Sequence, residues 1–125
     1  MAGRPLTTVL IIEDDAKIRS FIAATLEHYG LLATECASLA EARRAAMQAF
    51  PDVVLTDLIL ADGKAMELIT WLRARNPRVR VTFMSGFNES SVRDNEWIAA
   101  EDAFLAKPFD ISQMLRLLAI QPQAA

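Results

Sequence analysis

Asp52-Val53-Val54-Leu55-Thr56-Asp57 is the segment from which the architecture of this 125-residue chain can be inferred. Three consecutive apolar residues, two of them β-branched, are typical of a short strand covered on both faces, as in parallel sheets wrapped by helices. At about 3.3 Å of rise per residue, Asp52 and Asp57 would lie about 16 Å apart, so they cannot belong to one site. Asp57 would stand at the carboxyl end of the strand, which is where open α/β sheets bind their ligands.

Apolar strands and helical periodicity alternate on both sides of this segment. Four further strands are predicted at residues 9–12, 31–34, 79–84 and 103–106. Helices are predicted at residues 16–29, 38–50, 65–75 and 110–120, with a short or mobile helix of poor pattern within residues 88–100. Residues 58–63 are predicted to form a loop with a turn at Asp62-Gly63. Five strands alternating with five helices through right-handed crossovers predict an α/β fold with a doubly wound parallel sheet.

Several polar residues are most simply explained as helix caps or turn residues. Asp15 directly precedes the first predicted helix and is expected to cap it. Ser38 and Glu41 have the spacing of a capping box, and Asp110 with Gln113 indicates another cap. The predicted turn residues are Asp62 and Asp102.

Composition and charge indicate one globular domain and disfavour nucleic-acid binding. A chain with 53% hydrophobic and 23% charged residues can bury a sizeable core. The net charge of −3 provides no general basic field, so no direct contact with nucleic acid is expected. The arginines near Pro77 are interpreted as a solvated face: Arg73, Arg75, Arg78 and Arg80.

The remaining features of the chain indicate a cytoplasmic location. No apolar run is long enough to span a bilayer and no signal-peptide pattern is found, so no membrane contact is expected. The single cysteine, Cys36, cannot form an internal disulfide, which indicates a core position and a reducing compartment. Residues 1–6 are predicted to be a flexible leader, residues 7–120 the domain, and residues 121–125 a tail or linker stub.

Polar residues stand at the carboxyl ends of four predicted strands. Glu13 and Asp14 follow the first strand and Asp57 ends the third, while Ser85 and Lys107 follow the last two. Because these strand ends converge in a doubly wound sheet, the five side chains should be neighbours. Two like charges at about 4 Å cost on the order of 4 kcal/mol at an effective dielectric near 20, so a cation is expected among the carboxylates.

The residue types indicate phosphoryl chemistry with Mg²⁺. An all-oxygen ligand set without histidine or cysteine suits Mg²⁺. Lys107 supplies a fixed positive charge and Ser85 a hydroxyl donor, which together can offset charge on phosphoryl oxygens. Asp57 is then the nucleophile and forms an acyl phosphate.

Four motifs together resemble a known family over nearly the whole chain. They are Ile12-Glu13-Asp14-Asp15, Leu55-Thr56-Asp57-Leu58, Met84-Ser85-Gly86 and Phe104-Leu105-Ala106-Lys107-Pro108-Phe109. In this order and at strand ends, they resemble the receiver (REC) domain of two-component response regulators. The Met-Ser-Gly motif is similar to receivers attached to hybrid sensor kinases. The resemblance implies a flavodoxin-like (βα)5 sheet with strand order 2-1-3-4-5 and a receiver domain over residues 7–120.

The resemblance also implies roles for single residues. Glu13 and Asp14 would be the acidic pair that binds Mg²⁺, together with Asp57 and the backbone carbonyl of Ile59. Asp57 would be phosphorylated, and Lys107 would contact the phosphate. The implied switch residues are Ser85, whose hydroxyl moves toward the phosphate, and Phe104, an aromatic residue that changes rotamer and moves inward with it. A cis Lys107–Pro108 peptide bond is expected.

The implied function is a phosphorylation-dependent signalling switch of a phosphorelay. Its partner would be a histidine kinase or a histidine phosphotransfer protein, and phosphorylation would change a face near residues 88–106 and could promote a homodimer. Such a domain is a phosphoacceptor that assists its own phosphorylation and dephosphorylation, and it is not an enzyme in the usual sense.

Two alternatives stay open. One is an interaction or dimerisation module that is never phosphorylated. The other is a Mg²⁺-dependent phosphohydrolase, although such enzymes usually need a second acid two residues after the nucleophile and Ile59 stands there. Ile59 and Phe87 are apolar at two positions that flank the phosphoryl group in receivers. If they restrict access of a hydrolytic water, phospho-Asp57 should be comparatively long-lived.

Overall fold

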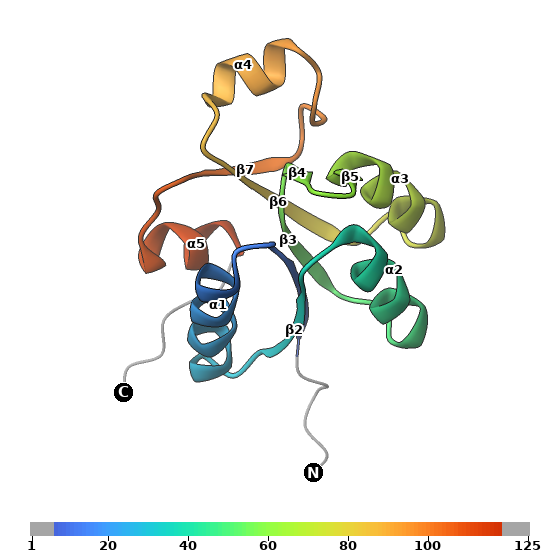
Figure 1. Cartoon of the computed structure of the whole chain (residues 1–125), viewed down its shortest axis with the longest axis vertical. Helices are drawn as coiled ribbons and strands as arrows, with labels where there is room; N and C mark the ends of the chain where they lie inside the picture. The colour runs from blue at the N-terminus through green and yellow to red at the C-terminus, as the bar shows by residue number, and fades with distance from the viewer. Residues whose placement is uncertain (1–6, 119–125) are drawn as a thin grey trace.

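The computed structural model describes residues 7–118, and these form a five-stranded parallel sheet covered by helices on both faces (Figure 1). The sheet order is β2-β1-β3-β6-β7, and all its strand pairs are parallel. The strands of the sheet are β1 (Thr8–Ile12), β2 (Leu32–Cys36), β3 (Val53–Asp57), β6 (Arg80–Ser85) and β7 (Ala103–Ala106). The helices are α1 (Ala16–His28), α2 (Leu39–Gln48), α3 (Ala65–Arg75), α4 (Glu89–Asp94) and α5 (Ile111–Leu117). Counted within this sheet alone, the order is the predicted 2-1-3-4-5, so the predicted fold is confirmed.

Strand β3 lies at the centre of the sheet, as its apolar sequence predicts. All five of its residues are buried, because helices cover both faces of a parallel sheet. Ile12 of β1 is level with Thr56, and Asp57 is level with Met84 of β6. The three strands therefore end near one another at the same edge.

The core has two layers, one on each face of the sheet. Helices lie on both sides of the sheet in Figure 1. Helices α1 and α5 cover one face with Ile22, Leu26 and Met114 among the buried side chains. Helices α2, α3 and α4 cover the other, where Leu72 and Val92 are fully buried. Each large apolar side chain removed from water in this way contributes about 1.5–3 kcal/mol, so the strand ends are held by a well-packed scaffold.

Helix boundaries agree with the predicted caps, with one correction. Asp15 accepts the Lys17 and Ile18 N–H groups, and Asp110 forms a full capping box with Gln113. Ser38 also caps α2 by accepting the Glu41 N–H. The predicted capping box is wrong in its second half, because the Glu41 carboxylate accepts the N–H of Ala37 instead of that of Ser38.

The segment after β3 also differs from prediction. Strands β4 (Ile59–Leu60) and β5 (Gly63–Lys64) form a small antiparallel hairpin where a loop was expected. Asp62 lies in its turn but does more than turn the chain, because its carboxylate accepts the backbone N–H groups of Leu39 and Ala40 at 3.0 and 3.1 Å. The hairpin thereby supplies a cap to the start of α2.

Asp102 is likewise more than the predicted turn residue. Its buried carboxylate accepts the Ala99 N–H at 2.8 Å and forms an ion pair with Arg73 of α3. The interpretation of Arg73 as part of a solvated face is therefore wrong, since this side chain is used to pair a buried acid.

Other expectations concern parts of the chain that the structure describes only in part. The predicted leader, the tail and the end of the last predicted helix lie outside residues 7–118. Between residues 7 and 118, no helix combines the length and apolar character needed to cross a membrane. Cys36 is buried as predicted.

Candidate functional site

Glu13 directly follows β1 and is fixed at all of its polar atoms. Its N–H donates to the Cys36 carbonyl at 3.1 Å, and its own carbonyl accepts Nη1 of Arg19 at 2.7 Å. Its carboxylate accepts the Asp15 N–H on Oε2 at 3.1 Å and Nζ of Lys107 on Oε1 at 2.6 Å. With 1% of its surface exposed, Glu13 is a buried acid whose position is set from four directions.

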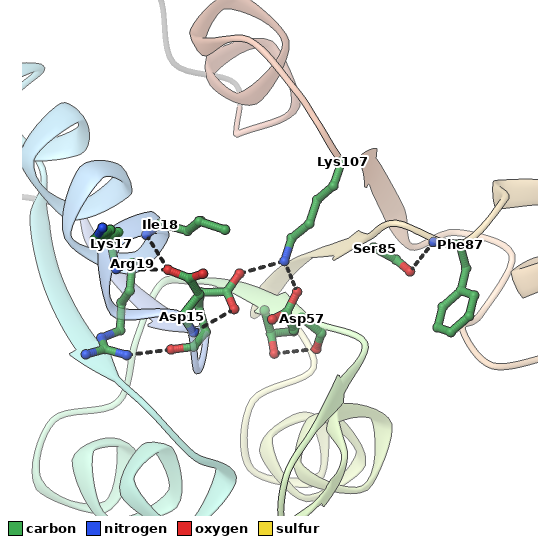
Figure 2. Close-up of polar contacts among 10 residues, drawn as sticks. Asp15, Lys17, Ile18, Arg19, Asp57, Ser85, Phe87 and Lys107 are labelled. Atoms are coloured by element: carbon green, nitrogen blue, oxygen red, sulfur yellow. Dashed lines mark hydrogen bonds and ion pairs between the residues drawn. The ribbon is translucent and has the colours of Figure 1, made fainter.

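Asp57 ends β3 and shares the same lysine. Nζ of Lys107 lies 2.5 Å from Oδ1 of Asp57, so one ammonium group contacts two carboxylates (Figure 2). Lys107 comes from the end of β7, where its N–H donates to the Ser85 carbonyl at 2.8 Å, and its bond to Pro108 is cis as predicted. Buried charges require such pairing, because an unpaired carboxylate in this position would be costly.

Asp14 completes a group of three acids. Ligand oxygens of Glu13, Asp14 and Asp57 all lie within 4.8 Å of one another. Asp14 is exposed, whereas the other two acids are buried. This donor set, with carboxylate oxygens and one side open to solvent, suits a hard divalent cation that keeps part of its water shell.

Burial and the shared lysine shift the proton affinities of the site. Burial, together with the neighbouring Glu13, raises the pKa of Asp57 to about 7, although Lys107 acts in the opposite direction. Burial also acts to raise the pKa of Glu13, but hydrogen bonds to Asp57, Lys107 and the Asp15 N–H lower it to about 2. Burial opposes the charge of Lys107, yet its two carboxylate partners raise its pKa overall. A proton on Asp57 would therefore compete with a cation for this carboxylate near neutral pH.

The Ser85 hydroxyl and the Phe104 ring make their contacts outside the acidic group. The Ser85 hydroxyl accepts the Phe87 N–H at 2.9 Å and points toward that residue in Figure 2. Within residues 7–118, the structure contains no hydrogen bond between this hydroxyl and Asp57. Phe104 is buried in the core, with 8% of its surface exposed, and its change of rotamer on phosphorylation stays a prediction.

The structure thus brings together four of the predicted site residues: Glu13, Asp14, Asp57 and Lys107. Ile59 lies two residues beyond Asp57 in β4, and the metal contact of its carbonyl stays a prediction. One contact was missed, that of the Arg19 side chain with the Glu13 carbonyl. The spacing of six residues across a helix start gives no sequence signal for it.

Comparisons with known proteins agree with this geometry. The family model described as "Response regulator receiver domain" matches residues 9–119, and the chain belongs to this family. It is 35% identical over 109 residues to the KDP operon transcriptional regulatory protein KdpE of Escherichia coli (strain K12), covering 87% of this chain and 48% of that protein. It is 29% identical over 109 residues to the sensor kinase CckA of Brucella abortus (strain 2308), covering 86% of this chain and 12% of the kinase. The chain therefore spans about half or less of these relatives.

Solved structures resemble the whole described fold. A CheY-like receiver domain protein from Methanospirillum hungatei JF-1 superposes with a TM-score of 0.80 at 25% identity, covering 92% of each chain. The receiver domain of the hybrid histidine kinase CckA gives a TM-score of 0.73 at 25% identity, covering 90% of this chain and 95% of that one. The predicted membership of the receiver family is thereby confirmed.

Proposed function

We propose that this chain is a phosphorylation-dependent switch of a two-component phosphorelay, acting in the cytoplasm. In this proposal Asp57 accepts a phosphoryl group from a phosphohistidine while Glu13, Asp14, Asp57 and the Ile59 carbonyl hold Mg²⁺. The observation that carries the proposal is the convergence of three carboxylates within 4.8 Å beside a lysine that contacts two of them. Mg²⁺, when bound, would offset negative charge on the transferring phosphoryl group.

The residues of the chain have separate tasks in the transfer. A carboxylate oxygen of Asp57 attacks phosphorus, the phosphorus–nitrogen bond of the donor breaks, and its electron pair returns to the imidazole nitrogen. Lys107, whose ammonium lies against Glu13 and Asp57, stabilises negative charge on the phosphoryl oxygens. Its ammonium is already held at the site by Glu13 and Asp57, so little reorganisation is required.

The response would begin at Ser85. Its hydroxyl now accepts the Phe87 N–H, and a phosphoryl oxygen on Asp57 would attract the same hydroxyl as a donor. The exchange would release the backbone at Phe87, next to α4, and allow Phe104 to repack within the core. The α4–β7 face would then change its affinity for a partner or for a second phosphorylated copy of the chain.

An apolar groove beside the site supports a protein as the phosphodonor, either a histidine kinase or a histidine phosphotransfer protein. The groove is lined by Lys17, Ile18, Phe21, Ile22, Lys107, Pro108 and Phe109. Phe21 of α1 is 56% exposed in it, and Lys107 belongs to both the groove and the acidic site. An exposed apolar surface that adjoins the reacting carboxylate suits a partner helix better than a small polar donor.

The test is incubation with a small phosphodonor and Mg²⁺, followed by intact-mass measurement. We expect a gain of about 80 Da, the mass of one phosphoryl group, that is absent in Asp57→Asn. Asp52→Asn is the matched control, since Asp52 lies at the other end of β3 and should leave the adduct intact. Size measurement on the same samples tests the homodimer.

The alternatives predict different results in this experiment. An interaction module that is not phosphorylated would give no adduct in any variant. A phosphohydrolase would turn over a generic phosphate ester, but the residue two positions after Asp57 is Ile59, which cannot transfer a proton.

The lifetime of the adduct depends on access of water. Ile59, two residues beyond Asp57, and Phe87, which donates its N–H to the Ser85 hydroxyl, are 45% and 54% exposed, so both apolar side chains border solvent. We expect Ile59→Asn to shorten the lifetime of the phosphorylated form, measured as loss of the adduct with time after removal of the donor. Equal lifetimes in the two proteins would contradict this role of Ile59.

A further inference from the structure

We propose that Arg19 is a positioning residue for the cation site: by holding the carbonyl of Glu13, it fixes where Asp14 stands. This inference rests on the proposed function, because it concerns the Mg²⁺ that the switch requires. Arg19 would not touch the cation or the phosphoryl group.

The Arg19 side chain reaches back from α1 over the helix start. Its Nη1 donates to the Glu13 carbonyl at 2.7 Å, six residues earlier in the chain (Figure 2). That carbonyl belongs to the peptide group that joins Glu13 to Asp14. Because a peptide group is planar, fixing its oxygen also fixes the direction in which the chain enters Asp14.

Arg19 is itself held from a second direction. Its Nε lies 3.3 Å from Oε1 of Glu35 in β2, and the Ser20 hydroxyl donates to the same oxygen. The side chain is 17% exposed, so the guanidinium group lies between α1, β2 and the turn. The guanidinium plane fixes the directions in which Nε and Nη1 donate, whereas the ammonium of lysine is a point charge on a flexible stem and would not hold both partners in this geometry.

Asp14 needs this support more than Glu13 does. The carboxylate of Glu13 has its own contacts with Lys107 and the Asp15 N–H. By contrast, within residues 7–118 the structure contains no hydrogen bond made by the carboxylate of Asp14, which is exposed. The position of the Asp14 oxygens relative to the other two acids therefore depends on the backbone that Arg19 holds.

The sign of the effect separates positioning from simple charge. If Arg19 acted only as a nearby positive charge, its removal would strengthen the attraction of the acids for Mg²⁺. If Arg19 positions Asp14, its removal should weaken Mg²⁺ binding despite the more negative site. Outer contacts of metal ligands typically change affinity by 10- to 100-fold, and we expect about tenfold for Arg19→Gln.

The experiment titrates MgCl₂ alone, without phosphodonor, at constant ionic strength and follows the backbone amide resonances of residues 13–15 and 57. Arg19→Gln should bind Mg²⁺ about tenfold more weakly, as typical for a lost outer contact, and Arg19→Lys should be intermediate because it keeps the charge but not the planar fork. Arg78→Gln is the matched control, since it removes the same charge from an exposed residue before β6, at the opposite end of the strands. Unfolding curves without metal establish that each variant is folded.

Unchanged or tighter Mg²⁺ binding by Arg19→Gln would overturn the inference while leaving the proposed function intact. If the wild-type protein showed no response to Mg²⁺, the proposed function would fail and this inference with it. Should Arg19→Gln not fold, Glu35→Gln removes the second anchor of Arg19 and is expected to weaken binding by a smaller factor. Wild-type affinity in both Glu35→Gln and Arg19→Lys would then contradict the proposal.

Discussion

The turn between β1 and α1 and the segment around Ser85 border the same site, but they differ in how many contacts hold them and in how far along the chain the partners lie. In the turn, the N–H, the carbonyl and both carboxylate oxygens of Glu13 have partners on four different residues. Ser85 ends β6, and its hydroxyl has a local partner only two residues away. The following helix, α4, spans six residues and contributes Val92 to the core. The difference teaches that the acidic site is held by contacts from several distant parts of the chain, whereas the Ser85 hydroxyl is held by one local hydrogen bond.

The largest expected effect tests this comparison directly. Leu26→Ala in α1 should lower the free energy of unfolding by about 3 kcal/mol, because it leaves a cavity in the core layer that α1 covers. Val92→Ala removes less volume from a short helix and should cost about 1 kcal/mol. Urea denaturation measures both values, and amide exchange should show Val92→Ala opening mainly residues 89–98. Equal global losses with no local opening would mean that the two regions are equally rigid.

The second prediction concerns the buried carboxylate of Asp57. The pKa of Asp57 is raised from 3.8 to about 7, so the folded state binds a proton more tightly than the unfolded state between these values. Stability should therefore fall as the pH rises from about 4 to 7. At about 1.4 kcal/mol per pKa unit the full shift corresponds to about 4 kcal/mol, and screening by water at the open side of the site reduces it. Asp57→Asn should therefore be about 2 kcal/mol more stable than wild type at pH 8, with the difference vanishing near pH 4. Thermal unfolding across this pH range checks it, and a difference independent of pH would contradict it.

The third prediction is stabilisation by metal. At ten times its dissociation constant, Mg²⁺ should add about 1.4 kcal/mol to the free energy of unfolding at pH 8. The gain should be smaller at pH 6, because the proton on Asp57 competes. Asp14→Asn should lose the gain yet keep the metal-free stability within about 0.5 kcal/mol, since Asp14 is exposed. A large loss of metal-free stability would show that the Asp14 side chain, like that of Glu13, makes contacts that stabilise the fold.

The smallest effect is expected at Ser85. Ser85→Ala removes one acceptor for the Phe87 N–H and should cost about 1 kcal/mol. The variant should still accept the phosphoryl group on Asp57, while the change in amide exchange of α4 after phosphorylation should be lost. A variant that responds like the wild type would mean that the signal leaves the site by another route.

Sequence reasoning recovered the fold and the acidic group because both depend on local patterns. Buried parallel strands are continuous apolar runs, and the residue after each run must lie at the ligand-binding edge. Helix α3 was predicted with its observed bounds because Asn76-Pro77 ends it.

The missed features depend on tertiary contacts that no local pattern encodes. The cap that Asp62 gives to α2 joins residues more than twenty positions apart, and the ion pair of Asp102 with Arg73 spans 29 positions. The hairpin of β4 and β5 has strands of two residues, which are too short for periodicity to be detected. The orientation of the Ser85 hydroxyl is a rotamer choice, and sequence does not determine it.

The outermost strands of the sheet have a consequence for how copies of the fold behave at high concentration. β2 and β7 end the sheet and are five and four residues long, and Glu35 lies on β2. Short outer strands, one of them carrying an acidic side chain, offer a poor template for another backbone to add to the sheet. Edge-to-edge pairing of the sheets of two molecules through β2 or β7 is therefore disfavoured. The backbone N–H and C=O groups on the outer sides of these strands would then be hydrogen-bonded to water.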